Sequence, residues 1–230
     1  MKVGFFDSGI GGTCILNAFR ELCPGVETEY VADTEHCPYG NRPSGEIIRL
    51  SEANVKKLLA RGCGMVVVAC NTATAAAIDY LRTNYPEIPF VGIEPALKPA
   101  ALRSKTGVVG VLATAGTFNG RLYNETKARF AKNVTVIAAV ADEFVVEVER
   151  LRGTPVERLR RAERARIERI VRAKVEPLLK AGADRIVLGC THFPHLKSVI
   201  ENVCAGRAEV VDPSMAVARQ AKRIMERMEE

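Results

Sequence analysis

Two short apolar segments, 120 positions apart, end in the same kind of sequence. Residues 66–72 read VVVACNT and residues 186–192 read IVLGCTH, so each runs from aliphatic residues through a small residue and a cysteine into polar side chains. Such runs are typical of buried parallel strands, and the polar residues behind them suit the start of a helix. Ligands of open α/β sheets bind at the carboxyl ends of strands. The sequence therefore predicts one pocket with Cys70 on one side and Cys190 on the other.

The alternation of strand-like and helix-like segments continues along the whole chain. Strands are predicted at residues 2–6, 28–32, 65–69, 90–93, 108–112, 134–138, 185–189 and 209–211. Helical patterns fill most of the gaps, and this order implies βαβ units around largely parallel sheets. The predicted fold class is α/β.

Two similar lobes are expected, each with one of the two cysteines. The first comprises residues 1–93 plus 208–230, and the second comprises residues 94–207. Residues 92–99, which include two prolines, are the predicted crossing between the lobes. The last helix, from residue 213, is expected to pack on the first lobe because the strand before it has no evident partner in the second.

Composition limits the possible classes of protein. The chain has 230 residues, of which 47% are hydrophobic and 26% charged, enough for an ample core. No apolar run reaches the roughly 18 residues of a membrane span, and Asp7 interrupts any signal-peptide core, so a cytoplasmic protein without membrane association is expected. Seven cysteines without a CxxC pair indicate reduced thiols rather than a disulfide framework.

The net charge of +6 is concentrated in one region. Residues 150–174 hold nine arginines and one lysine, as a nucleic-acid surface would. However, Thr154 to Glu157 resembles a capping box in front of a long amphipathic helix, and Glu168 and Arg172 are spaced as an ion pair on a solvated helix face. No aromatic residues interleave to stack on bases. A basic nucleic-acid or partner-binding protein without enzymatic activity is the less favoured alternative.

The N-terminal strand leads into a glycine-rich turn. Residues 6–12 read FDSGIGG, which lets the backbone approach a ligand closely at the start of a helix. The spacing lacks the GxGxxG pattern of dinucleotide sites, and Asp7 would repel a pyrophosphate. A small ligand with an ammonium group fits better, with Asp7 binding the ammonium and Ser8 offering a hydroxyl.

Other polar loops follow predicted strands. Asp33 leads into residues 37–40, CPYG, where the amides of Tyr39 and Gly40 suit a carboxylate. Residues 113–117 offer two hydroxyls before a helix. Each loop taken alone is equally compatible with a purely structural role.

The segment behind Cys190 contains two histidines. Cys190, His192 and His195 have metal-binding side chains, but no second cluster completes a ligand set, so no metal is expected. His192 is better placed as a polar neighbour of the cysteine or of a substrate, and His195 is expected at the surface.

Six segments together resemble the glutamate racemase family, within the cofactor-independent aspartate/glutamate racemase superfamily. They are residues 6–12, residues 32–34 with 38–40, residues 69–73, residues 93–95, residues 110–117 and residues 189–194. The resemblance implies two α/β domains related by a pseudo-twofold axis, with the active site in the cleft between them. It also implies an isomerase that converts L-glutamate to D-glutamate without a cofactor. D-glutamate would supply peptidoglycan biosynthesis, and so cell-wall biogenesis and cell shape.

The resemblance also assigns site residues. Cys70 and Cys190 match the two catalytic cysteines, and Asp7, Asp33 and His192 match supporting polar residues. Matches to substrate contacts are Asp7, Ser8, Pro38, Tyr39, Gly40, Asn71, Thr72, Thr114, Thr117, Thr191 and His192. The family's Cys-Pro pair before the assisting carboxylate is absent from residues 141–149, ADEFVVEVE. Glu149 takes that role by alignment, with Glu147 or Glu143 as alternatives.

Two cysteines also suit the chemistry of racemisation. A proton leaves Cα on one face and another arrives on the opposite face, so two bases avoid moving the substrate between the steps. Each cysteine precedes a predicted helix, a position that lowers a thiol's pKa. By the family's assignment, Cys70 takes the proton from D-glutamate and Cys190 from L-glutamate.

Some alternatives stay open at the level of sequence. The same superfamily contains racemases of aspartate and of other amino acids, as well as decarboxylases and isomerases, although a single-cysteine decarboxylase would not explain the matched pair. The expected partner is the small-molecule substrate. The protein is expected to form a homodimer, and binding to nucleic acid is not expected.

Overall fold

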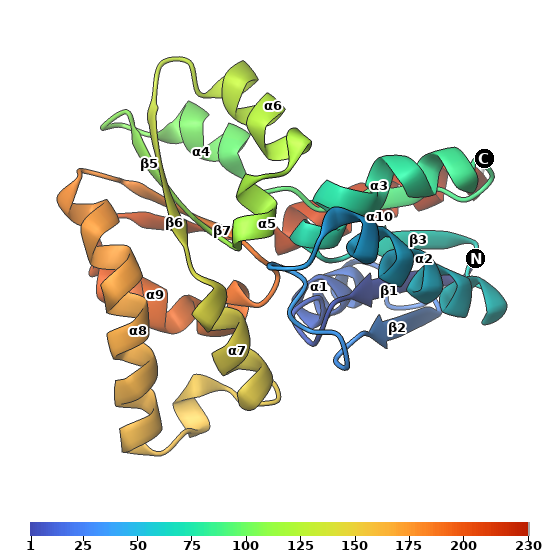
Figure 1. The fold of residues 1–230 in the computed structure, drawn as a ribbon, viewed down its shortest axis with the longest axis horizontal. Coiled ribbons are helices and arrows are strands. Elements are labelled where there is room, and N and C mark those ends of the chain that lie inside the picture. The colour runs from blue at the N-terminus through green and yellow to red at the C-terminus, as the bar shows by residue number, and fades with distance from the viewer. Residues whose placement is uncertain (230) are drawn as a thin grey trace.

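The computed structural model describes residues 1–229 and contains two four-stranded parallel sheets (Figure 1). The first sheet has the order β2-β1-β3-β4 and the second β6-β5-β7-β8. Their strands are β1 (Val3–Asp7), β2 (Thr28–Ala32), β3 (Met65–Val68), β4 (Phe90–Gly92), β5 (Val108–Ala113), β6 (Thr135–Val140), β7 (Arg185–Gly189) and β8 (Glu209–Val211). Every predicted strand is present, with ends within two residues of the prediction, and the α/β fold class is confirmed.

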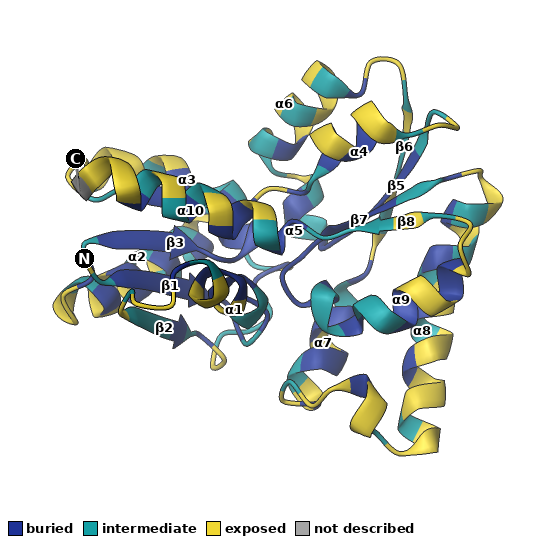
Figure 2. Ribbon diagram, turned by 180° about the vertical axis from the view of Figure 1, so that it is seen from behind, coloured by how far each residue is buried: buried dark blue, intermediate teal, exposed yellow. Residues whose placement is uncertain are grey.

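Helices cover both faces of each sheet. They are α1 (Thr13–Leu22), α2 (Ser44–Ala60), α3 (Asn71–Asn84), α4 (Leu97–Arg103), α5 (Ala115–Phe118), α6 (Arg121–Phe130), α7 (Asp142–Arg150), α8 (Arg161–Lys180), α9 (Lys197–Cys204) and α10 (Ser214–Glu229), with short 3₁₀ turns η1 (Val156–Arg158) and η2 (Phe193–Leu196). The central strands β1, β3, β5 and β7 are largely buried, whereas the outer faces of the helices are exposed (Figure 2).

Burial on both faces explains the continuous apolar character of the central strands. In β3, Met65 and Val67 pack toward α1 and α10, while Val66 and Val68 pack toward α2 and α3. Alternate side chains point to opposite faces of a sheet, so a strand covered on both faces has no polar positions.

The two sheets repeat one topology. Adding four to each strand number of the first order reproduces the second order. Consequently β3 and β7 hold equivalent places, and the cysteine that follows each strand lies at an equivalent strand end. The matched sequence segments therefore reflect a real structural repeat.

One expectation about the C-terminal region is wrong. Strand β8 pairs with β7, with Ile186 opposite Val210, so it completes the second sheet and does not belong to the first lobe. With only three residues at a sheet edge, it carries too short an apolar pattern to reveal its partner. Helix α10 does pack on α1 of the first lobe, as predicted, through Val217, Ala218 and Ala221.

The arginine-rich region also differs from the prediction. Thr154 does not cap a long helix, because residues Val156–Arg158 form a separate 3₁₀ turn and α8 begins only at Arg161. The Glu157 carboxylate accepts a hydrogen bond from Ser198 Oγ at 2.7 Å. The predicted pair on the exposed face is present, with Arg172 Nη2 2.8 Å from Glu168 Oε1.

Among residues 1–229, no helix combines the length and the apolar character that crossing a bilayer requires.

Candidate active site

The two cysteines lie at the facing ends of the two sheets. Cys70 is the N-cap of α3, and its Sγ accepts a hydrogen bond from Ala73 N at 3.4 Å. Cys190 follows β7 directly. Both residues are buried, with 4% and 7% of their surface exposed.

Asp7 connects the surroundings of the two thiols. The Cys70 thiol donates to Ser8 Oγ at 3.5 Å, and the Ser8 hydroxyl lies 3.5 Å from Asp7 Oδ1. From the second lobe, the Thr191 hydroxyl lies 3.4 Å from both carboxylate oxygens of Asp7. The predicted residues Asp7, Ser8, Cys70 and Thr191 thus meet across the lobe interface.

Asp7 is completely buried at the end of β1. Burial raises its pKa, while the charge of His192 and the amide of Gly12, which donates to Oδ2 at 2.7 Å, act in the opposite direction. A buried carboxylate beside the thiols suits the binding of a ligand ammonium group, because that cation would replace the lost hydration.

Cys190 has a different polar neighbour from Cys70. His192 Nδ1 lies 3.7 Å from Cys190 Sγ, and His192 Nε2 lies 2.6 Å from Glu149 Oε1. Ile10 N donates to the same carboxylate oxygen at 2.8 Å. Burial opposes ionisation of Glu149, yet the hydrogen bonds from His192 and Ile10 hold the pKa of this carboxyl below its ordinary value. An ionised Glu149 therefore fixes the orientation of His192 against Cys190.

The other two candidate carboxylates face away from the thiols. Glu147 pairs with Arg150 and Arg166, and Glu143 pairs with Lys174 on α8. Of the three alternatives, the fold brings Glu149 to the site.

Asp33 supports the loop that carries Tyr39 rather than a thiol. Tyr39 OH donates to Asp33 Oδ2 at 2.6 Å, and His36 Nδ1 lies 2.7 Å from Asp33 Oδ1. The hydrogen bonds that Asp33 accepts from Tyr39, His36 and Asn54 outweigh burial and lower the pKa of its carboxyl. Asn54 Nδ2 donates to Asp33 Oδ2, the oxygen that also accepts from Tyr39, at 3.2 Å. Sequence reasoning missed Asn54, whose signal is a polar residue on the buried face of α2.

Polar groups from both lobes also meet near Thr72. Its hydroxyl lies 2.9 Å from that of Thr114, which lies 3.0 Å from that of Thr117. Gly40 is close to Thr114 and to Gly116, so the loop after Pro38 closes over this contact. The predicted residues Gly40, Thr72, Thr114 and Thr117 are therefore neighbours.

Asn71, the first residue of α3, has an unpaired side chain. Both of its amide atoms are buried and have no hydrogen-bond partner among the described residues. Buried polar atoms are rarely left unpaired unless a ligand or water completes them. A polar ligand beside Cys70 would satisfy this amide.

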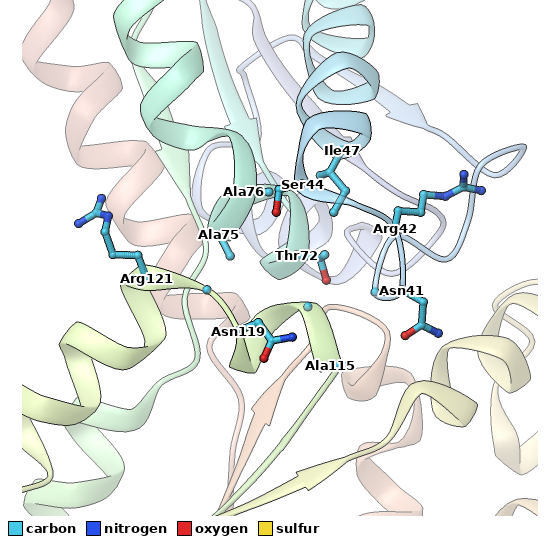
Figure 3. A pocket seen from close by; sticks show the side chains of 13 residues that line it. Asn41, Arg42, Ser44, Ile47, Thr72, Ala75, Ala76, Ala115, Asn119 and Arg121 are labelled. Carbon is cyan, nitrogen blue, oxygen red and sulfur yellow. The ribbon is translucent and has the colours of Figure 1, made fainter.

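A cavity of about 500 Å³ leads to this region between the lobes (Figure 3). Thr72 lies on the wall of the cavity, and its hydroxyl also contacts that of Thr114. The cavity therefore adjoins the site. Arg42 and Arg121 flank it from opposite lobes, as the close view shows. Both arginines are paired with carboxylates, Arg42 with Glu46 and Arg121 with Asp79 and Glu125.

His195 does not join Cys190 and His192 in a group of metal ligands, because its ring contacts Thr13 and Cys14 instead. His195 is partly buried rather than on the surface, and its Nε2 lies 3.4 Å from Cys14 Sγ and from Thr13 Oγ1. A different set of donors does come together. Cys37, Glu149 and His192 each place one ligand atom within 4.8 Å of the other two.

The thiols are less acidic than their positions before helices predict. Burial, followed by the negative charge of Asp7, raises the pKa of Cys70 to about 12, although Ser8 and the Ala73 amide act in the opposite direction. Burial raises the pKa of Cys190 well above its ordinary value. The expectation that the helix ends lower these pKa values is wrong, because desolvation of a thiolate outweighs one or two amide hydrogen bonds.

This gives an expected pH dependence. Both thiols are protonated near neutral pH, and below its pKa the thiolate fraction grows tenfold per pH unit. If a thiolate is the base, kcat/KM for an amino-acid substrate should rise nearly tenfold per unit between about pH 7 and 9. Steady-state rates at constant ionic strength test this. A flat profile over that interval would contradict a thiolate with a raised pKa.

Gly11 is expected to be essential for bringing the lobes together. A Cβ at this position would lie 2.6 Å from His192 Nδ1 and 2.7 Å from the His192 backbone nitrogen. Backbone atoms cannot rotate away, so Gly11→Ala should displace His192 and lower kcat/KM by about 100-fold. Gly25→Ala is the matched control, since a Cβ there meets nothing within 4 Å. Equal activities of the two variants would contradict this role.

Comparisons with known proteins agree with this site. A family model described as Asp/Glu/Hydantoin racemase matches residues 16–221. A glutamate racemase of Herpetosiphon aurantiacus is 45% identical over 225 residues, which cover 97% of this chain and 84% of that protein. One of Roseiflexus sp. is 42% identical over 224 residues, covering 97% and 79%.

A solved structure extends the likeness to the fold. Escherichia coli glutamate racemase, crystallised with L-glutamate and the activator UDP-MurNAc-ala, superimposes with a TM-score of 0.84 at 32% identity, covering 98% of this chain and 82% of that one. The similarity spans both sheets and the residues between them. The chain therefore belongs to the glutamate racemase family, within the Asp/Glu/hydantoin racemases.

Proposed function

We propose that this protein interconverts L-glutamate and D-glutamate by a two-base mechanism at Cα. The observation that carries the proposal is the pair of buried thiols at equivalent strand ends, joined through Ser8, Asp7 and Thr191. Relatives named glutamate racemase match nearly the whole chain, which supports glutamate as the substrate.

The proposed reaction needs one thiolate and one thiol. With L-glutamate bound, the Cys190 thiolate removes the Cα proton while the Cys70 thiol delivers a proton to the opposite face. The reverse reaction exchanges these roles. The cysteines are thereby left in the opposite protonation states after each turnover, ready for the other enantiomer.

The neighbouring groups stabilise the charge that develops during proton transfer. The carbanion formed at Cα shifts negative charge onto the α-carboxylate, which needs aligned donors in a site shielded from water. Asn71, Thr72 and Thr191 are buried beside the thiols and supply such donors. We assign the substrate ammonium to Asp7, whose buried carboxylate contacts Ser8, the neighbour of the Cys70 thiol.

Glu149 is proposed as a positioning residue that acts through His192. Replacing Glu149 with glutamine would remove the charge that holds His192 against Cys190, so kcat/KM should fall by about 100-fold. Enantiomers have equal free energies, so the equilibrium constant is one and kcat/KM must fall equally in both directions. Only the individual kcat values are free to differ, with the larger loss expected when Cys190 is the base.

Glu147→Gln provides the matched control for this prediction. Glu147 lies two residues away on α7 but pairs with Arg150 and Arg166. Its loss should affect stability rather than turnover. Initial rates for each enantiomer, with thermal unfolding of both variants, separate the two effects. Equal turnover of the Glu149→Gln variant and the unmodified protein would remove Glu149 from the mechanism.

The cellular role follows from the reaction. D-glutamate would be used for peptidoglycan biosynthesis, and hence for maintaining the cell wall and cell shape. All seven cysteines are free thiols, which fits the reducing cytoplasm. The homodimer stays a prediction.

Chiral analysis after incubation of the EDTA-treated protein with L-glutamate tests the proposed function. D-glutamate should accumulate to an equal mixture without added cofactor. L-aspartate in a parallel incubation tests the alternative substrate, and faster racemisation of aspartate would change the assignment. No racemisation of either amino acid would overturn the proposal.

A further inference from the structure

Three metal-binding side chains meet beside Cys190, on the lobe interface. Cys37 comes from the loop after β2, Glu149 from α7, and His192 from the segment after β7. Each offers one ligand atom within 4.8 Å of the other two, and this is the one such group of three found among residues 1–229. The two lobes therefore contribute to a single cluster of sulfur, oxygen and nitrogen donors.

The cluster has nearly the size of a zinc site. Zinc binds thiolate sulfur at about 2.3 Å and histidine nitrogen or carboxylate oxygen at about 2.0–2.2 Å, so tetrahedral ligands are roughly 3.3–3.8 Å apart. The donor atoms need to move by only about 1 Å or slightly more to reach that geometry. The contact between His192 Nε2 and Glu149 Oε1, now 2.6 Å, would open around the ion.

The donor set selects the class of metal. One thiolate, one carboxylate and one imidazole neutralise a divalent cation, and the sulfur favours Zn²⁺ or Co²⁺ over Mg²⁺ and Ca²⁺. Cys37 is only half-buried and the Glu149 side chain is 22% exposed, so an ion can reach the cluster. His192, 1% exposed, forms the inner wall.

We propose that Cys37, Glu149 and His192 form a binding site for a zinc-type divalent cation, and that occupation of this site inhibits the enzyme. On binding, a metal–sulfur bond forms, the Cys37 S–H bond breaks, and the proton passes to solvent. Neutral His192 coordinates through nitrogen, and water completes the fourth position. Binding of the ion to the Glu149 carboxylate replaces the hydrogen bonds from His192 and Ile10. The bound ion also links the two lobes across the cleft. The inhibition rests on the proposed racemase function, whereas the binding does not.

Cobalt titration of the EDTA-treated protein tests binding independently of activity. A thiolate bound to Co²⁺ gives a near-ultraviolet charge-transfer band, which Zn²⁺ should abolish by displacement. Cys37→Ala should lose this band and bind Co²⁺ at least about tenfold more weakly. Cys14→Ser is the matched control, because Cys14 is another half-buried thiol beside an imidazole, and it should leave the band unchanged. Cys37→Ser, with circular dichroism of each variant, guards against misfolding.

The activity of the same variants tests inhibition. Zn²⁺ should inhibit the unmodified protein and Cys14→Ser reversibly, with recovery on adding EDTA, while Cys37→Ala should keep its turnover at the same Zn²⁺ concentration. A cobalt band that persists in Cys37→Ala would place the metal on another thiol and overturn the site. Absence of any thiolate band would also overturn it, whether or not the protein racemises glutamate. Bound metal without loss of turnover would overturn only the inhibition.

Discussion

Replacing either Cys70 or Cys190 with alanine is expected to lower racemisation of both enantiomers by at least about 1,000-fold. Each enantiomer requires one cysteine as base and the other as acid, so the loss of either stops both directions. General acid–base groups typically contribute 10²–10⁴-fold each. Chiral analysis of product from L-glutamate and from D-glutamate measures the effect.

Two controls separate this loss from unfolding. Cys23→Ala removes another buried thiol, one that packs between α1 and α10 away from the site, and should keep its turnover. A β-substituted amino acid that loses its leaving group needs only one base, so each single-cysteine variant should still eliminate from one enantiomer. Near-normal racemisation by Cys70→Ala or Cys190→Ala would sink the two-base assignment.

The fold was predictable because its signals are local and repeated. Each central strand, such as β3 and β7, is an unbroken apolar run, and each is followed by polar residues that begin a new element. In a parallel sheet the carboxyl ends of all strands lie at the same edge, so the residues that follow the strands are brought close together by the fold class alone. That is why the meeting of Cys70 and Cys190 between two sheets follows from the sequence.

Features that depend on tertiary contacts were not predictable in the same way. The partner of β8 is chosen by packing at a sheet edge, and three residues carry too little pattern to identify it. Thr154 has the sequence of a cap, but the chain turns at η1 and the helix starts later. In the second case, tertiary contacts overrode the local propensity of Thr154 to cap a helix.

The electrostatics of the site were the least predictable part. A position before a helix lowers a thiol's pKa only if the thiol stays hydrated, and no local pattern reveals that Cys70 is enclosed together with Asp7. The choice of Glu149 over Glu147 likewise depends on which face of α7 meets the other lobe. The spacing of two residues places Glu147 and Glu149 on different faces of α7, but it does not identify the face that packs against the other lobe.

Deuterated water should show which faces of the substrate the two thiols serve. Starting from L-glutamate, the Cys190 thiolate would remove protium, and Cys70, already exchanged with solvent, would deliver deuterium from the opposite side. Early D-glutamate should therefore carry nearly one deuterium at Cα, while the remaining L-glutamate stays largely protiated. Mass spectrometry of the separated enantiomers at low conversion measures both labels.

A single base would leave a different record. If one group both removed and returned the proton, it would carry substrate protium across to the product, or it would exchange with solvent and label both enantiomers. The enantiomer that is labelled first changes with the substrate. From D-glutamate, early L-glutamate should carry the deuterium, because Cys70 is then the base and Cys190 delivers the deuterium. Early product that retains most of its original protium in either direction would refute the two-thiol mechanism, since a thiol already exchanged with solvent has only deuterium to deliver.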